Sequence, residues 1–130
     1  MTHLTKPLRD CCMIEIRLPW PPKELNPNKR LHFAVVAQHK RTHRAACAQA
    51  TTEQLNANPA ASVFKRPHLH MVFYPPNRIR RDWDNLVASM KAGLDGVSDA
   101  LGIDDHYFKI SLEVSTHLGG YVNLTITEDA

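Results

Sequence analysis

The feature that most constrains this chain is the placement of its prolines and glycines. None occurs between Lys29 and Gln54, where alanine is abundant, whereas Pro19–Pro22, Pro75–Pro76 and Gly119–Gly120 interrupt the sequence elsewhere. Proline cannot donate a backbone hydrogen bond inside a helix or a strand, and alanine has the highest helix propensity. We therefore predict a long helix from about Lys29 to Gln54, with or without a break, followed by a linker over Asn56–Ser62.

Four segments alternate apolar and polar residues, which is the pattern of a strand with one buried face. In chain order they are Cys12–Leu18, Pro67–Tyr74, His106–Leu118 and Tyr121–Thr127. We expect Pro67–Tyr74 to be a central strand of the sheet.

A second helix is expected from about Asp84 to Ala100, with Gly102 ending it. Gly93 and Gly96 lower its helix propensity. The two glycines at positions 119 and 120 are expected to form a two-residue hairpin turn between the last two strands. The resulting order, β-α-β-α-β-β, predicts a single α+β (mixed α/β) domain over residues 1–130, with a mixed sheet and two helices.

The composition is that of an ordinary globular protein, with 43% hydrophobic and 22% charged residues. No apolar run approaches the roughly 18 residues that a membrane-spanning helix needs, and the start of the chain lacks the apolar core of a signal peptide. We therefore expect a cytoplasmic protein with no membrane partner. The odd number of cysteines favours reduced thiols over disulfides for Cys11, Cys12 and Cys47.

The net charge of +3 says little by itself, but the charges are unevenly distributed. Basic residues crowd Lys40–Arg44 and Arg78–Arg81, and acidic residues gather at Asp82–Asp84 and Asp99–Asp105. A basic surface beside an acidic cluster is typical of phosphate binding around a metal site. Either basic run alone is more often a solvated surface.

Asp82 and Asp84 are the centre of the acidic cluster. In an extended segment, residues two apart place both side chains on one face. Two carboxylates that point at one place favour a cation between them, and Mg²⁺ or Mn²⁺ prefers such oxygen ligands. Asp104 or Asp105 would supply a third carboxylate. The alternatives are structural, with Asp84 as a helix N-cap and the Asp104–Asp105 pair as a turn.

The helix after Asp84 has two distinct faces at about 100° per residue. One face is apolar and is formed by Leu86, Met90, Leu94, Val97 and Leu101. The face below Asp84 carries Lys91 and Asp95. A lysine there could contact a phosphate or stabilise a leaving oxygen. Alternatively, it forms only an ion pair with Asp95, four residues later.

Two groups of histidines allow a metal-binding and a structural interpretation. His39, His43 and Cys47 recur every four residues on the long helix, but a half-buried or solvated helix face is the better interpretation. His68 and His70 face one side of an expected strand, where a packed or exposed pair is favoured over a ligand pair.

Together these motifs resemble the RusA family of Holliday junction resolvases over most of the chain. Arg81-Asp82-Trp83-Asp84-Asn85-Leu86 is similar to the family's R-D-x-D-N-L signature. Asp104-Asp105 is similar to its second acidic motif, Leu18-Pro19-Trp20-Pro21-Pro22 to its opening strand and proline turn, and Leu124-Thr125-Ile126-Thr127-Glu128 to its closing strand.

The resemblance implies a homodimer that binds four-way DNA junctions and cuts two strands symmetrically, using Mg²⁺. It implies that Asp82, Asp84 and Asp105 are the catalytic carboxylates. The family's type member has a functional lysine where this chain has Ala88. Lys91 lies about one turn further along the same helix face and resembles the lysine of phage-type relatives.

We therefore expect a metal-dependent endonuclease that leaves 5′-phosphate and 3′-hydroxyl ends at a junction. The residues expected to bind DNA phosphates are Lys40, Arg41, Arg44, Arg78, Arg80 and Arg81, together with Lys91. Trp20 and Trp83 could stack on exposed bases, or serve packing. Two alternatives stay open: a catalytically weak protein that binds branched DNA, favoured by Ala88, and a nuclease acting on flaps or other branches.

Overall fold

The structure is a computed structural model that describes residues 13–59 and 64–128. Its elements are β1 (Ile14–Pro19), the 3-10 helix η2 (Lys23–Leu25), α2 (Phe33–Ala57), β2 (Pro67–Tyr74), α3 (Trp83–Leu101), the 3-10 helix η4 (Asp105–Tyr107), β3 (Lys109–Val114) and β4 (Tyr121–Glu128). The α+β class and the element order predicted from the sequence are confirmed. Cys11, Cys12 and part of the expected linker, positions 60 to 62, lie outside the described residues.

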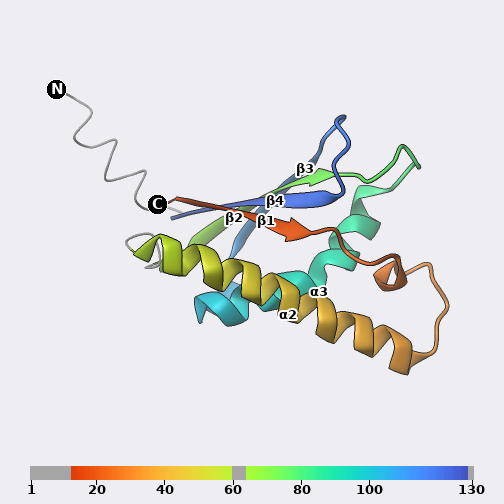
Figure 1. Ribbon diagram of the computed structural model, residues 1–130, viewed down its shortest axis with the longest axis horizontal. Helices are drawn as coiled ribbons and strands as arrows, with labels where there is room; N and C mark the ends of the chain where they lie inside the picture. Colours follow the sequence, from red (N-terminus) through yellow and green to blue (C-terminus); the bar gives the residue numbers. More distant parts are fainter. Residues whose placement is uncertain (1–12, 60–63, 129–130) are drawn as a thin grey trace.

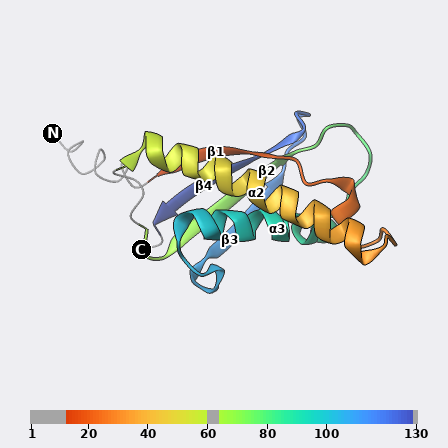
Figure 2. The same ribbon diagram turned by 60° about the horizontal axis from the view of Figure 1, so that its bottom comes forward.

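The sheet has the strand order β1-β4-β2-β3. β4 is antiparallel to both β1 and β2, whereas β3 runs parallel to β2. A parallel pair needs a crossover connection, and α3 is the crossover that joins β2 to β3. Both long helices lie on the same side of the sheet (Figures 1 and 2). β2 is therefore a central strand, as predicted.

The core lies between the sheet and α3. Its strand side consists of alternate residues of three strands: Ile14, Ile16 and Leu18 of β1, Leu69, Met71 and Phe73 of β2, and Val122, Leu124 and Ile126 of β4. The helix side consists of the buried residues Leu86, Met90, Leu94 and Val97, with Leu101 partly buried. The apolar face predicted for this helix is therefore confirmed.

The two long helices approach closely where α3 carries glycines. A Cβ atom at Gly96 would collide with the backbone carbonyl of Arg44, and one at Gly93 would lie 2.8 Å from Nε2 of His43. His43 and Cys47 are buried on the facing side of α2, with 3.8 Å between Nε2 and Sγ. Burial lowers the pKa of His43 and raises that of Cys47 to about 12. The half-buried or solvated face expected for these residues is therefore wrong for His43 and Cys47, which are buried because they face the glycines of α3.

The hairpin expected between the last two strands is wrong. β4 inserts between β1 and β2, so β3 and β4 lie on opposite sides of β2. The turn before β4 is held at the end of β2, where the N–H groups of Gly119 and Gly120 donate to the carbonyls of Pro75 and Tyr74. Gly120 has a φ of 79°, which glycine adopts without strain. An alternating pattern identifies a strand but not its partner, which explains the error.

Several element boundaries also differ from those expected. α2 begins at Phe33 and continues to Ala57, so it includes the start of the expected linker. The first part of the expected strand His106–Leu118 belongs to η4, and β3 ends at Val114. Gly102 does end α3, in the left-handed conformation with a φ of 69°. No helix among the described residues is long and apolar enough to span a membrane.

Candidate functional site at the start of helix α3

Asp82 and Asp84 lie on either side of the first residue of α3. Asp82 occupies the N-cap position with extended backbone angles, φ −86° and ψ 137°, but its carboxylate makes no capping hydrogen bond. Asp84 is already helical, and its Oδ1 accepts a hydrogen bond from the N–H of Asn85 at 2.9 Å. The expected extended segment with both carboxylates on one face is therefore wrong, as is the N-cap role for Asp84, because the helix begins at Trp83.

The two carboxylates of the second acidic motif have different partners. Asp104 precedes η4, and its Oδ1 accepts the N–H of His106 at 2.9 Å, which confirms the turn interpretation for this residue. The carboxylate of Asp105 instead lies against α3, where its Oδ2 is 2.6 Å from Nζ of Lys91. Asp105 is thus the member of the pair that contacts the helix carrying Asp84.

Lys91 forms two ion pairs, to Asp105 at 2.6 Å and to Asp95 at 2.9 Å. The predicted pair with Asp95 is confirmed, whereas the contact with Asp105 was not predicted. The hydrogen bond to Asp105, followed by that to Asp95, raises the pKa of Lys91 above its ordinary value. The same hydrogen bond from Lys91 lowers the pKa of Asp105. The lysine and the carboxylate therefore both stay charged over a wide pH range.

The carboxylates suit a hard divalent cation by their chemistry, since all four are exposed and offer oxygen ligands. Asp82 and Asp84 form no ion pair with a described residue. As the side chains stand, no three His, Cys, Asp or Glu residues within 13–59 and 64–128 are grouped to hold a metal. The metal site formed by Asp82, Asp84 and Asp105 therefore stays a prediction that requires side chains to move together.

The segment leading into α3 carries two cations without a partner among the described residues. Arg78 and Arg80 are exposed and make no hydrogen bond or ion pair with the described part of the chain. Arg81 differs, because its guanidinium donates to the carbonyls of Asn77 and Ile79 and to Oδ1 of Asn77, at 2.8 to 3.1 Å. Arg81 therefore shapes the loop, whereas the other two arginines are available for an anion.

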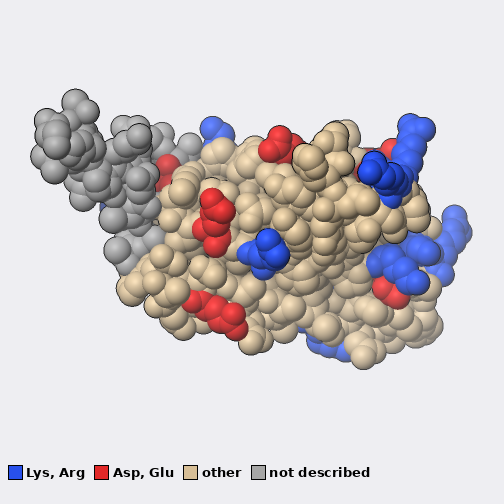
Figure 3. All heavy atoms as spheres, turned by 45° about the horizontal axis from the view of Figure 1, so that its top comes forward, with Lys and Arg blue, Asp and Glu red and all other residues tan. Residues whose placement is uncertain are grey.

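Basic side chains gather at one end of the molecule. Figure 3 shows Lys and Arg side chains gathered at the right-hand end, where the chain passes from β2 to α3 in Figure 1. Two apolar side chains of this segment are also exposed: Ile79 is 68% and Trp83 65% exposed. Core packing is thus excluded as the role of Trp83 within this chain.

A groove between α2 and α3 is lined by the basic residues of α2 on one side and by Lys91 of α3 on the other. It has a volume of about 410 Å³ and is lined by Leu25, Lys40, Arg41, Arg44, Ala88, Ser89, Lys91, Ala92 and Asp95. Lys40 and Arg41 have no ion pair with a described residue. Arg44 binds Asp99 with two hydrogen bonds, of 2.7 and 2.8 Å, which raises the pKa of Arg44 and lowers that of Asp99.

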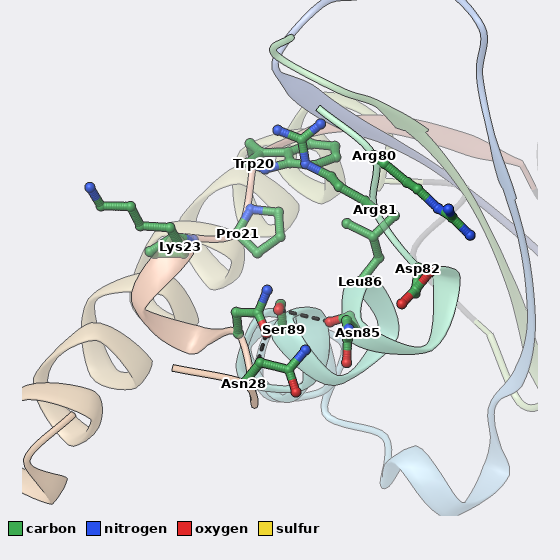
Figure 4. A pocket seen from close by; sticks show the side chains of 12 residues that line it. Trp20, Pro21, Lys23, Asn28, Arg80, Arg81, Asp82, Asn85, Leu86 and Ser89 are labelled. Carbon is green, nitrogen blue, oxygen red and sulfur yellow. Dashed lines mark hydrogen bonds between the residues drawn. The ribbon is translucent and has the colours of Figure 1, made fainter. Parts of the chain in front are cut away.

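A second pocket, of about 280 Å³, lies directly beside Asp82. It is lined by Trp20, Pro21, Pro22, Lys23, Asn26, Asn28, Arg80, Arg81, Asp82, Asn85, Leu86 and Ser89 (Figure 4). The contribution of Lys23, Asn26 and Asn28 was missed in the sequence. In the sequence these three residues belong to a polar loop after a proline-rich turn. That pattern does not indicate how far the loop lies from Asp82.

One polar cluster lies outside this site. Ser111 Oγ is 2.7 Å from both Nε2 of His68 and Nδ1 of His70, and Nε2 of His70 is 3.6 Å from Glu113. These residues lie on β2 and β3, and their side chains are half-buried or exposed on the side of the sheet without helices. The hydroxyl thus partners both histidines, which agrees with a packed pair.

Comparison with known proteins gives a relative of almost the same extent. The chain is 33% identical over 129 residues to an uncharacterised protein of Xylella fastidiosa (strain Temecula1), and the match covers 93% of this chain and 84% of that protein. The chain belongs to the family of this Xylella protein. No family model matches the chain.

Membership of the Xylella protein's family brings no activity with it, because that protein is uncharacterised. Function must therefore be argued from the site. The site consists of exposed carboxylates at the start of α3, a lysine bound to Asp105, and basic residues on two neighbouring segments that pair with no residue of 13–59 or 64–128.

Proposed function

We propose that this protein is a Mg²⁺-dependent endonuclease that resolves four-way DNA junctions, similar to the RusA family. One observation carries the proposal. Asp82 and Asp84 are exposed without a cationic partner in the described chain, directly after the unpaired Arg78 and Arg80. Unneutralised charges of both signs on one surface suit a substrate and an ion that carry the opposite charges.

In this proposal the chain's own residues have distinct tasks. Asp82, Asp84 and Asp105 hold the ion, which when bound supplies positive charge to the phosphate and to the attacking water. Arg78 and Arg80 bind phosphates of the strand that is cut. The oxygen of water bonds to phosphorus in line with the 3′ oxygen, and the bond from phosphorus to that oxygen breaks. The leaving 3′ oxygen takes up a proton, so the products carry 5′-phosphate and 3′-hydroxyl ends.

Lys91 has a different task, because its Nζ already contacts Asp105 at 2.6 Å. A cation at this position stabilises negative charge that develops on the leaving oxygen. Lys91 lines a groove together with Lys40 and Arg41, which extends the basic surface onto α2. Lys40 and Arg41 bind phosphates further from the cut.

The proposal includes a homodimer. Two symmetric cuts require two active sites, and twofold symmetry is the commonest closed arrangement of identical chains. The supporting argument is the symmetry of the substrate. Sedimentation of the free protein and of its junction complex tests it, and a monomer in both states at micromolar concentration would contradict it.

The deciding experiment is cleavage of a synthetic four-way junction by the full chain with Mg²⁺, beside a flap and a linear duplex of the same sequence. Paired cuts in the junction alone, lost on chelation of the ion, are the expected result. Preferred cleavage of the flap would assign the protein to other branched DNA. An absence of cleavage in all three substrates would overturn the enzymatic proposal.

A second candidate is a protein that binds branched DNA and cuts it poorly. Two observations favour it: the family lysine position is Ala88, and the described residues contain no group of three acidic or histidine side chains ready to hold a metal. This candidate predicts no useful turnover in that experiment, but tight and specific binding of the junction with Mg²⁺ present in a separate binding assay.

A further inference from the structure

The pocket beside Asp82 is formed by three segments that are distant in the sequence. They are the turn after β1 with η2 and the loop that follows it, the approach to α3, and the first two turns of α3. Its volume of about 280 Å³ lies at the small end of the range of ligand pockets, which suits one ring system rather than a whole nucleotide chain. The chemistry of its walls indicates which ring.

One wall is aromatic and rigid. Trp20 packs edge-on against the buried Phe73, with ring centroids 5.9 Å apart and planes at 89°. The guanidinium carbon of Arg81 lies over the Trp20 ring, 5.5 Å from its centre, and the loop hydrogen bonds of Arg81 fix it there. The ring of Trp20 and the planar guanidinium over it both line the pocket, and each offers a flat surface on which another flat ring stacks.

The opposite wall carries free amides. In Figure 4 the side chains of Asn28, Asn85 and Ser89 lie across the pocket from Trp20. The backbone of Asn28 is fixed by a hydrogen bond from its N–H to Asn26, and that of Asn85 by one from Ser89 to its carbonyl. Their side-chain amides form no hydrogen bond with a described residue. Each amide therefore offers donors and an acceptor from a backbone position that is held by a hydrogen bond.

We propose that this pocket receives one unstacked nucleobase of the strand that is cut, and that Asn28 makes the cleavage depend on which base it is. The proposal rests on the proposed function. A stacking wall facing unpartnered amides matches a base, whose faces are apolar and whose edge carries donors and acceptors. Because Asp82 lines the same pocket, the base belongs to a nucleotide next to the phosphate that is cut. Lys23 and Arg80, at the pocket edge, bind its flanking phosphates.

The test varies each base beside the cut in turn and measures single-turnover cleavage by the wild type and by Asn28→Ala. A good amide–base pair discriminates at least about tenfold between bases, or roughly 1.4 kcal/mol. We expect Asn28→Ala to reduce the ratio of best to worst base by about that factor, with junction affinity changed less than about threefold. Asn123→Ala, on β4 away from the pocket, is the matched control and should keep the full ratio.

A second measurement does not require cleavage. A junction carrying 5-iododeoxyuridine beside the cut, bound with Ca²⁺ in place of Mg²⁺, is irradiated, and the crosslinked residue is identified. We expect a crosslink to Trp20, because the base lies on its ring. A crosslink elsewhere, together with an unchanged base ratio in Asn28→Ala, overturns the pocket while cleavage by the wild type leaves the proposed function standing. Failure of the wild type to bind or cut any junction overturns both.

Free deoxynucleoside monophosphates form the last arm of the test. Suppose that the wild type binds one of these nucleotides, that Asn28→Ala abolishes this binding, and that cleavage does not depend on the base beside the cut. The pocket is then a site for free nucleotides, and the proposal is contradicted. Weak binding of free nucleotides with a strong base effect in the junction supports it.

Discussion

The two ends of α3 differ in how their polar groups are satisfied. The C-terminal half packs against α2, and polar side chains there have partners. The half-buried Ser98 donates to the carbonyl of Ile103 at 2.6 Å, and the buried Thr51 of α2 donates to the carbonyl of Cys47 at 2.8 Å. The N-terminal turn is exposed, and its carboxylates have no cationic partner in the described chain.

The difference separates framework from binding surface. An unpaired polar group inside the seam between α2 and α3 would destabilise the fold, so the chain fills that seam with glycines and neutral side chains. An unpaired charge at the exposed end costs little because water solvates it, and it stays available to a ligand. The four predictions that follow test this separation.

The largest effect is expected for Asp84→Asn at the exposed end. Negative charge at the start of a helix also interacts favourably with the helix dipole, by at most about 1 kcal/mol. If Asp84 had only that role, the variant would lose some stability and no activity. We expect a loss of cleavage of at least about 1,000-fold, equivalent to about 4 kcal/mol of barrier.

Junction binding by Asp84→Asn should stay intact or become tighter, because one carboxylate fewer repels the phosphates. Single-turnover cleavage and a filter-binding assay separate the two quantities. Asp99→Asn is the control, since Asp99 is exposed on the same helix but pairs with Arg44. Normal cleavage by Asp84→Asn would remove the metal site from the start of α3.

The second effect concerns stability and is expected at Gly96. Glycine to alanine in a helix interior ordinarily stabilises by up to about 1 kcal/mol. Here the added Cβ would collide with the carbonyl of Arg44, and such overpacking costs about 1–3 kcal/mol. We expect Gly96→Ala to lower the free energy of unfolding, as measured with urea. A gain in stability would mean that the seam is not tightly packed.

Gly102→Ala, just after the same helix, is a comparison in which the added Cβ destabilises for a different reason. No atom lies within 4 Å of a Cβ placed at Gly102, but its φ of 69° is left-handed. This variant measures the cost of left-handed backbone alone, about 1–2 kcal/mol for a side chain with a Cβ. It also leaves the contact between α2 and α3 unchanged.

The local pattern of the sequence was sufficient for much of the fold. The bounds of β2 were predicted to the residue, and α3 to within one residue at either end. The alternation and the helical period depend only on which face of an element is buried, and the sequence displays that directly. The αL residue that ends α3 is likewise a local property of Gly102.

What the sequence did not reveal depends on distant residues. The pairing of β4 with β1 and β2 is a property of the whole sheet, and no pattern in Tyr121–Glu128 reveals it. Gly93 and Gly96 were taken as weak points of a helix, because the carbonyl and imidazole they face lie on α2. Likewise, only the structure shows that Lys91 contacts Asp105 and that Asn28 and Asp82 line the same pocket.

A moderate effect is expected for Lys91→Ala. Its Nζ contacts Asp105, so its loss removes a cation from the site and allows the pKa of Asp105 to return toward its ordinary value. We expect cleavage at least about tenfold slower, equivalent to about 1.4 kcal/mol, with a smaller change in affinity.

The double variant Lys91→Ala with Ala88→Lys tests whether the position or only the charge matters. Ala88 lines the same groove as Lys91, so a lysine there should recover part of the rate. Asp95→Asn is the control, because it removes the other partner of Lys91 and leaves the contact with Asp105 in place. A normal rate for Lys91→Ala would make Lys91 a surface partner of Asp95 and Asp105 only.

The smallest effect belongs to the buried seam and concerns His43. Its burial against α3 lowers the pKa of the imidazole below 6.5, so the folded protein holds His43 neutral where the unfolded chain already binds a proton. The free energy of unfolding therefore falls as the pH drops from 6.5 toward the folded pKa, and it is independent of His43 above that range. Cys47 does not titrate in this pH range, because burial raises the pKa of its thiol to about 12.

The measurement is urea unfolding of the wild type and of His43→Gln between pH 7.5 and about 5. Other groups titrate in both proteins, so their difference isolates His43, and we expect it to shift in favour of His43→Gln as the pH falls. A difference that stays constant with pH would mean that His43 reaches water in the folded protein, and the contrast between a dry seam and a solvated start of α3 would then be lost.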